Sequence, residues 1–325
     1  SMAFAAQEAN GVAINTTTQQ VYDDVSLALL AASAGDTIKL GCMDVKFIHV
    51  NHSIPDAVAF AIRTPAGTLI HTGDFKIDST PIDGGMIDLA RFAELGKEGV
   101  LCMMADSTNA ERPGYTESES KVGGSFELLF RKAEKRRIIV ATFSSNIHRL
   151  QQIIDEANRC GRKVAVSGRS MSNVVSIASE LGYLKVPQNV LIEIENLRNY
   201  SPEKTVVITT GSQGETMSAL TRMATGEHRK VKITPNDLVI ISATPIPGNE
   251  KAISRIINNL YEKGAEVIHD KKTDVHVSGH ACREDIKLIY SLVNPKYSIP
   301  VHGEYKHLVA QAKIAEELEW QLEYV

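Results

Sequence analysis

The sequence is short of several features that would place it in a common class of protein. Its four cysteines, Cys42, Cys102, Cys160 and Cys282, are far apart and form no Cys-x-x-Cys pair, which argues against a structural zinc ribbon or a disulfide framework. No apolar run approaches the roughly 20 residues that cross a bilayer. The N-terminus also lacks the basic, apolar and small-residue order of a secretion signal. We therefore expect a cytoplasmic protein without a membrane partner.

A strong charge of either sign is absent too. The formal net charge is −4, so no global basic field attracts nucleic acid, and any RNA path must be a local positive groove or depend on metal ions. The densest basic run covers residues 131–137. It is either a solvated helix end or a track for phosphates.

The 325 residues exceed the size at which a single hydrophobic core stops growing, which is roughly 250 to 300 residues. Two domains are therefore expected. Between residues 37 and 78, short β-like runs alternate with polar or Gly/Pro turns, as in an antiparallel sheet. These runs are 37–40, 45–50, 57–62 and 69–72.

The pattern changes between about residues 138 and 264 to an apolar strand, a small polar loop and an amphipathic helix, repeated four times. The strands are expected at 138–141, 164–166, 206–208 and 238–241. Such repeats predict a parallel, doubly wound sheet whose loops lie at the carboxyl ends of the strands, where helix N-termini offer N–H groups to phosphate. After about Asp270 the β pattern returns, and residues 304–322 are expected to form a closing helix.

Histidines beside glycines follow several β-like runs. The phrases His276-Val277-Ser278-Gly279-His280 and Pro300-Val301-His302-Gly303-Glu304 lie near the end of the chain. Two others, at 51–56 and 71–76, lie far upstream and contain His52 and Asp74. Imidazoles and carboxylates from distant segments are what a dinuclear metal site that cuts phosphodiesters needs, so the four phrases predict one pocket.

These phrases, together with Asp106-Ser107-Thr108 and the segment 209–215, resemble the ribonuclease J family in residue type and in order. That family is a branch of the metallo-β-lactamase-fold nucleases that carries an inserted β-CASP domain. The resemblance runs from about Gly35 to the last residue. It implies the α/β class, with a partial metallo-β-lactamase-like αββα sandwich at 1–108 and 271–325 and a doubly wound β-CASP domain at 109–270.

The resemblance also assigns metal ligands. His52, Asp74 and His302 match family positions that hold Zn²⁺, with Mn²⁺ or Mg²⁺ as alternatives, and Asp74 matches the carboxylate that bridges two ions. Taken singly, the residues allow structural roles, because His52 could cap a turn and Asp74 could accept bonds from a glycine turn.

His280 matches the family general acid, and a histidine near neutral pKa suits protonation of a departing sugar oxygen. Asp106 matches the acid that orients this imidazole. The alternative for Asp106 is a turn or N-cap aspartate.

Substrate contacts are expected in two places. His276, Ser278 and the backbone of Gly279 would bind the scissile phosphate, although His276 could equally be a structural strand histidine. Further candidates would hold a 5′ phosphate or the RNA backbone, unless they only form strand-to-helix turns. These are Arg169, Ser212, Gln213 and Gly214.

The sequence departs from the family at its strongest signature, a His-x-His-x-Asp-His turn that supplies most ligands. No histidine occurs before His49, and the chain stops at Val325 without the family's extra C-terminal domain. The expected consequences are a truncated chain, an incomplete metal site, and an apolar sheet face that a second copy or another partner covers.

The predicted function is that of a metal-dependent ribonuclease acting on RNA as a 5′–3′ exonuclease, an endonuclease or both. Two alternatives remain open. One is a catalytically impaired RNA-binding or interaction module that keeps the β-CASP cleft, and the other is a DNA nuclease of the same superfamily. The inserted α/β module argues against a β-lactamase-like or thioester hydrolase.

Overall fold

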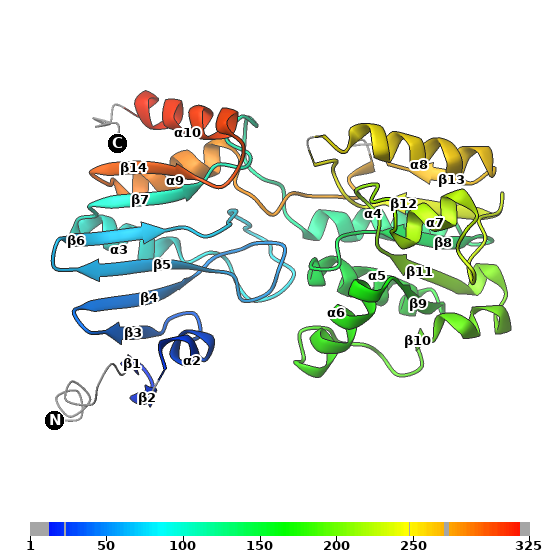
Figure 1. Ribbon diagram of the computed structural model, residues 1–325, viewed down its shortest axis with the longest axis horizontal. Coiled ribbons are helices and arrows are strands. Elements are labelled where there is room, and N and C mark those ends of the chain that lie inside the picture. The colour runs from blue at the N-terminus through cyan, green and yellow to red at the C-terminus, as the bar shows by residue number, and fades with distance from the viewer. Residues whose placement is uncertain (1–12, 23, 247, 270–272, 319–325) are drawn as a thin grey trace. The chain divides into compact units, whose positions relative to one another are not determined.

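A computed structural model describes residues 13–22, 24–246, 248–269 and 273–318 (Figure 1). The chain forms two compact units. The first comprises Ser1–His52, Asp56–Thr116 and Gly279–Val325, and the second comprises Ser53–Pro55 and Glu117–Ser278. The sequence predicts boundaries after residues 108 and 270, and the second of these positions lies outside the described residues.

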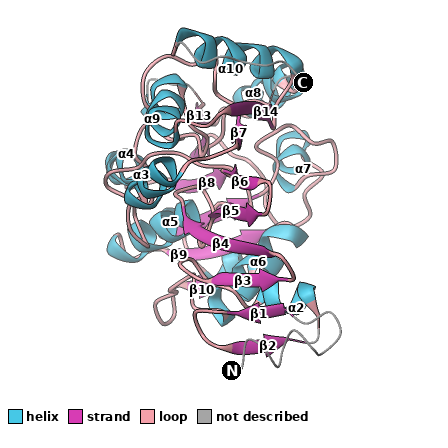
Figure 2. Cartoon of the chain, turned by 90° about the vertical axis from the view of Figure 1, so that its left-hand side faces the viewer, coloured by secondary structure: helices cyan, strands magenta, loops and turns pink. Residues whose placement is uncertain are grey.

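A mixed eight-stranded sheet forms the first unit, in the order β14-β7-β6-β5-β4-β3-β1-β2. Its strands are β1 Ala13–Asn15, β2 Gln20–Tyr22, β3 Thr37–Leu40, β4 Met43–His49, β5 Val58–Thr64, β6 Gly67–His71, β7 Cys102–Asp106 and β14 Tyr297–Val301. Strands β6, β7 and β14 are parallel, and the remaining neighbours are antiparallel. Figure 2 shows β6, β5, β4, β3, β1 and β2 side by side in this order.

One face of this sheet is covered by helices α3 Leu89–Glu98, α9 Arg283–Val293 and α10 Tyr305–Glu317. Alternate strand residues such as Ile70 and Met103 pack there against Phe92 and Tyr290, which are fully buried. Because successive side chains of a strand point to opposite faces, the residues between them face the other way.

That second face is apolar but only partly covered. Helix α2, Val25–Leu30, packs over its far end with Ala28. Towards β14, Leu69 and Met104 are only half-buried, and Ile299 is 40% exposed. An apolar sheet face with this exposure matches the surface expected from the sequence.

Six strands, all parallel, form the sheet of the second unit in the order β10-β9-β11-β8-β12-β13. They are β8 Arg137–Ala141, β9 Lys163–Ser167, β10 Leu191–Ile192, β11 Thr205–Thr209, β12 Asp237–Ile241 and β13 Glu266–Ile268. The helices are α4 Ser120–Lys132, α5 Ile147–Arg159, α6 Arg169–Glu180, α7 Ala219–Thr225 and α8 Glu250–Glu262, with 3₁₀ turns η1 Ile194–Asn199 and η2 Pro202–Lys204.

Both faces of this parallel sheet are buried, which explains why its strands are apolar throughout. Ile138 and Val140 pack on one side against α4, α5 and α6. Ile139 and Ala141 pack on the other side against α7 and α8. The predicted α/β class and the doubly wound inserted sheet are thus confirmed.

The predicted strands agree with the structure to within a few residues at their ends. The closing helix expected at 304–322 is α10, which ends at Glu317, and residues 319–322 lie outside the described part of the chain. Among the described residues, no helix combines the length and the apolar character that crossing a bilayer demands.

The basic run at 131–137 is largely paired with acids of its own unit. Arg131 forms an ion pair with Glu127, and Arg137 with Asp237. Arg136 likewise pairs with Glu266. These bonds support a structural role for the run, since paired guanidinium groups are less available to phosphate.

A buried polar network joins four segments of the second unit. The fully buried side chain of Arg149 donates from Nε to Glu119 Oε1 at 2.7 Å, and its Nη1 donates to Ser242 Oγ and to the carbonyl of Val275. Arg149 therefore connects α5 to the start of α4, to the end of β12 and to the segment that leads out of the unit.

Replacing Arg149 with Met should lower the free energy of unfolding of this unit by about 3–5 kcal/mol, because the Glu119 carboxylate would be left buried and unpaired. Urea unfolding followed by circular dichroism measures the change. The matched variant Arg149→Met/Glu119→Gln should recover part of the loss. If the single and double variants are equally destabilised, the ion pair does not explain the effect.

Candidate active site

Three parallel strands of the first unit bring residues from distant positions to one edge of the sheet. Asp106 ends β7, Asp74 lies three residues after β6, and His302 directly follows β14. Because β6, β7 and β14 are parallel neighbours, the carboxyl ends of these strands lie beside one another. His52 follows β4, and His280 precedes α9.

The turn that carries Asp74 requires glycine. Gly73 has φ +60°, and a Cβ atom there would lie 2.7 Å from the carbonyl oxygen of Val58. The Gly73 N–H donates to His71 Nδ1 at 3.0 Å, and the Asp106 N–H donates to Thr72 Oγ1 at 3.1 Å. The two acid-bearing segments are therefore fixed to each other.

A left-handed backbone places His302. This residue has φ +58°, which is unusual for a residue other than glycine, and Gly303 follows with φ +119°. The Glu304 N–H donates to His307 Nδ1 at 3.1 Å and closes the first turn of α10. Such a sparsely populated conformation persists only where the surrounding structure enforces it.

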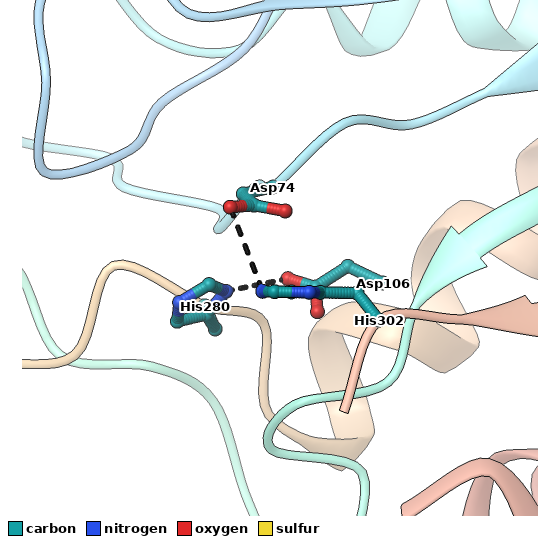
Figure 3. Close-up of side chains that lie close together, drawn as sticks. All are labelled: Asp74, Asp106, His280 and His302. Carbon is teal, nitrogen blue, oxygen red and sulfur yellow. Dashed lines mark hydrogen bonds and ion pairs between the residues drawn. The ribbon is translucent and has the colours of Figure 1, made fainter. Parts of the chain in front are cut away.

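His280 and Asp106 form a hydrogen-bonded pair. His280 Nδ1 donates to Asp106 Oδ2 at 2.8 Å, while Oδ1 accepts from the N–H and the hydroxyl of Thr108 at 2.9 and 2.7 Å (Figure 3). The Asp106 side chain is 1% exposed and that of His280 is 21% exposed. This hydrogen bond fixes the imidazole with Nδ1 facing Asp106.

The two groups shift each other's pKa. Burial acts to lower the pKa of His280, but the hydrogen bond and the charge of Asp106 outweigh it and raise that pKa above the ordinary value. Burial acts to raise the pKa of Asp106, but the hydrogen bond and the charge of His280 lower it overall. The imidazole therefore keeps its proton to a higher pH than a free histidine does.

Asp74 faces two imidazoles. Its Oδ2 lies 3.7 Å from His302 Nε2 and 3.9 Å from His52 Nε2. Figure 3 shows Asp74 and His302 pointing toward each other beside the His280–Asp106 pair. His52 Nδ1 donates to the carbonyl of Gly279 at 2.8 Å, which leaves the Nε2 lone pair of this residue directed at Asp74. Burial lowers the pKa of His52 and so favours the neutral form that binds metals.

These residues fit a metal ion. Among the described residues, ligand atoms of Asp74, Asp106, His280 and His302 lie within 4.8 Å of one another. Both oxygens of Asp106 already accept protein hydrogen bonds, so the better donors are His52, Asp74 and His302. Their nitrogen and oxygen atoms suit Zn²⁺, whose tetrahedral ligands lie about 3.3 Å apart. Three donors of this kind would be enough to hold one ion and would leave one tetrahedral position open.

The other candidates lie in or next to the second unit. His276 and Ser278 are half-buried, and Gly279 is buried. Arg169 is exposed at the start of α6, after Gly168 with φ +113°. Ser212 is 3% exposed, and Gly214 is half-buried with φ +80°.

The side chain of Gln213 is occupied within its own unit. Its Nε2 donates to the carbonyl of Thr244 at 3.0 Å, and its Oε1 accepts from the N–H of Ile246 at 2.7 Å. The amide thus joins the loops after β11 and β12, so it shapes this edge of the sheet rather than projecting from it.

Comparison with known proteins identifies the family of the chain. Residues 135–260 match the model "Ribonuclease J, beta-CASP domain", and residues 265–325 match "Zn-dependent metallo-hydrolase RNA specificity domain". The chain is 49% identical over 278 residues to ribonuclease J of Helicobacter pylori strain J99, covering 86% of this chain and 40% of that protein. The chain belongs to the ribonuclease J family.

Other members of the ribonuclease J family give the same result. Ribonuclease J of Synechocystis is 46% identical over 89% of this chain and 45% of its own length. Ribonuclease J 1 of Streptococcus pyogenes is 48% identical over 85% of this chain and 49% of its own length. The chain thus spans about half the length, or less, of these relatives.

One solved structure supports the fold alone. It is a protein of unknown function from Enterococcus faecalis V583, with a TM-score of 0.60 and 16% identity, and the match covers 84% of this chain and 61% of that one.

Several residues that support this site belong to no motif in the sequence. Asn51 joins two segments, donating from Nδ2 to the carbonyl of Gly85 and accepting from the Ile87 N–H on Oδ1. Thr72 and Thr116 are further examples. Among these supporting residues, Asp285 has a local sequence signal. It is an acid at the third position of the helix at 283–293 and completes a capping box.

The pKa of His280 in metal-free protein should lie above the ordinary histidine value and should fall in Asp106→Asn. Because the pKa of His280 is raised in the folded state, the stabilisation of the fold by the His280–Asp106 pair is fully present below the ordinary histidine pKa. This stabilisation is lost as pH rises through the raised pKa. It is also lost at low pH, as Asp106 is protonated. Titration by NMR of histidine-labelled protein in chelator checks this. Equal pKa values in the two proteins would contradict it.

Proposed function

We propose that this chain carries the catalytic acid and part of the metal site of a ribonuclease that hydrolyses RNA phosphodiesters. The observation that carries the proposal is the His280–Asp106 hydrogen bond beside the donors Asp74, His302 and His52. The family match supports an RNA substrate, because one matched model is described as an RNA specificity domain.

His52, Asp74 and His302 would hold Zn²⁺, with Mn²⁺ or Mg²⁺ as alternatives. Such an ion, when bound, polarises a phosphoryl oxygen and makes a water molecule more acidic. Asp74 contributes a carboxylate that lies close to the imidazoles of His302 and His52, and this set of donor atoms suits a divalent cation.

His280 would act as the general acid. When water attacks phosphorus and the bond to the leaving sugar oxygen breaks, that oxygen takes a proton from His280 Nε2. Asp106 keeps Nδ1 in its donor state and stabilises the imidazolium before the transfer, as a triad carboxylate does. The raised pKa of His280 supports this role, since the imidazolium is then populated near neutral pH.

The proposal also assigns residues that would contact the RNA substrate. Ser278, the backbone of Gly279 and His276 lie next to His280 in the chain and would contact the scissile phosphate. Arg169, Ser212 and Gly214 would contact a 5′ phosphate or the RNA backbone, with the Gln213 amide shaping the loop. Both 5′–3′ exonucleolytic and endonucleolytic cleavage are compatible with these roles. A reducing cytoplasmic setting is supported by the four free cysteines.

His280→Ala should lower kcat for RNA cleavage by roughly 10²- to 10⁴-fold, because the leaving oxygen then departs without a proton donor. The assay uses 5′-monophosphorylated single-stranded RNA with added Zn²⁺ or Mn²⁺. His269→Ala, which removes an exposed histidine of the second unit, is the matched control and should leave kcat unchanged. Equal rates for wild type and His280→Ala would remove the proposal, and preferential cleavage of DNA of the same sequence would favour a DNA nuclease.

A second candidate, an RNA-binding module without chemistry, is favoured by the number of metal donors. Among the described residues, His52, Asp74 and His302 would offer donors to one ion. We expect one Zn²⁺ per chain by elemental analysis, with loss of the ion in Asp74→Asn. No bound metal together with tight RNA binding would favour the module, whereas two ions per chain would show further ligands.

The proposal also concerns the partly exposed face of the eight-stranded sheet in the first unit. We expect a second copy of this chain to cover Leu69, Met104 and Ile299, because exposed apolar surface of this kind usually marks an interface. Light scattering should then show a dimer that Ile299→Lys dissociates. A monomer in both proteins would contradict this and leave another polypeptide as the cover.

A further inference from the structure

Side chains hold both peptide carbonyls that flank the imidazole of His280. The carbonyl of Gly279 accepts from His52 Nδ1 at 2.8 Å. The carbonyl of His280 itself accepts from Asn109 Nδ2 at 3.0 Å and from Thr116 Oγ1 at 2.9 Å. The backbone that carries the imidazole is therefore fixed from segments far away in the sequence.

Thr116 is in turn fixed by a fully buried acid, Asp285. Asp285 Oδ2 accepts from the Thr116 N–H at 2.8 Å, from Thr116 Oγ1 at 2.7 Å and from the Cys282 N–H at 2.9 Å. In the part of the chain that the structure describes, Asp285 Oδ1 is buried without a hydrogen-bond partner.

The hydroxyl of Thr116 can form only a limited number of hydrogen bonds. It has one hydrogen and two lone pairs. One lone pair accepts from the Cys282 N–H at 2.9 Å, and the hydrogen is shared between the His280 carbonyl and Asp285. A side chain of the same shape without the hydroxyl would lose all three interactions at once.

Backbone bonds extend the same contact on both sides. Asn109 forms a parallel bridge with Cys282, the Arg283 N–H donates to the carbonyl of Arg112, and the Glu284 N–H donates to that of Gly114. The segment before Thr116 thus lies along the start of α9, and Thr116 sits where this contact reaches His280.

We propose that Thr116, held by Asp285, is a positioning residue that sets the orientation of His280 so that Nδ1 meets Asp106 Oδ2. The inference rests on the proposed function, because it gives the general acid its geometry. Thr116 does not touch the substrate in this scheme. Its hydroxyl holds the His280 peptide, and the imidazole direction follows from that peptide.

Three variants separate this role from general stability. Thr116→Val removes the hydroxyl and keeps the side-chain shape, while Thr116→Ser restores the hydroxyl. Thr205→Val is the matched control, because Thr205 is also buried and donates from Oγ1 to a carbonyl, that of Pro202, at 2.7 Å in the second unit. Both Val variants lose one buried Thr hydroxyl, but only one of these hydroxyls reaches His280.

The first measurement needs no metal and no activity. In full-length, metal-free protein labelled with ¹⁵N-histidine, the Nδ1–H of His280 gives a downfield proton resonance that Asp106→Asn identifies by its loss. We expect this resonance to disappear in Thr116→Val and to persist in Thr116→Ser and Thr205→Val. A wild-type resonance in Thr116→Val would overturn the proposal.

The second measurement is RNA cleavage. Thr116→Val should lower kcat by roughly 10- to 100-fold, the usual effect of losing a partner that orients an active-site group, with KM changed less than about twofold. Thr116→Ser and Thr205→Val should keep wild-type kcat, and an equal loss in Thr205→Val would overturn the proposal. If wild type cleaves no RNA, the proposed function fails while the resonance still decides the positioning role.

A further variant tests the proposal if Thr116→Val does not fold. If thermal denaturation shows that Thr116→Val is unfolded, Thr116→Cys replaces the hydroxyl with a thiol that is a much weaker donor. The same loss of the His280 resonance is expected there. Its retention would count against the proposal as directly as in the Val variant.

Discussion

The parallel pairing of β7 with both β6 and β14 is the constraint on which the site depends. Antiparallel neighbours would send successive loops to opposite edges, whereas three parallel strands deliver Asp74, Asp106 and His302 to the same edge. Parallel strands need long crossover connections, and those connections are α3 and the inserted unit together with α9. The chemistry at this edge is therefore bound to the topology of the whole chain, and no local segment could form it alone.

Apolar periodicity and motif order predicted most of the fold and much of the site. The runs at 138–141 and 206–208 are continuous and apolar because both faces of the inner sheet are buried, and that property is visible in the sequence. The resemblance to the family implied that His280 and Asp106 belong together, although 174 residues separate them. What supports these residues could not be predicted in the same way. Asn51, Thr116 and Asp285 are ordinary polar residues, and their role exists only through distant partners.

Polar residues at the ends of strands have two competing uses, and the sequence does not distinguish between them. Gln213 lies in a glycine-rich loop at the carboxyl end of β11, where a phosphate contact is a reasonable expectation, but its amide is taken up by the neighbouring loop after β12. The basic run at 131–137 behaves similarly, because its arginines pair with acids of their own unit. In both cases the deciding bond joins residues that are remote in the sequence.

The contacts around Thr116 also explain how a large insertion can interrupt the site without disturbing it. The chain leaves the first unit after Thr116 and re-enters it at Gly279, and the entropic cost of closing an insertion grows only slowly with its length. The bonds of Asp285 to Thr116 and Cys282, and that of Thr116 to the His280 carbonyl, join the two ends at the insertion point. These bonds fix the first unit at the insertion point, next to His280.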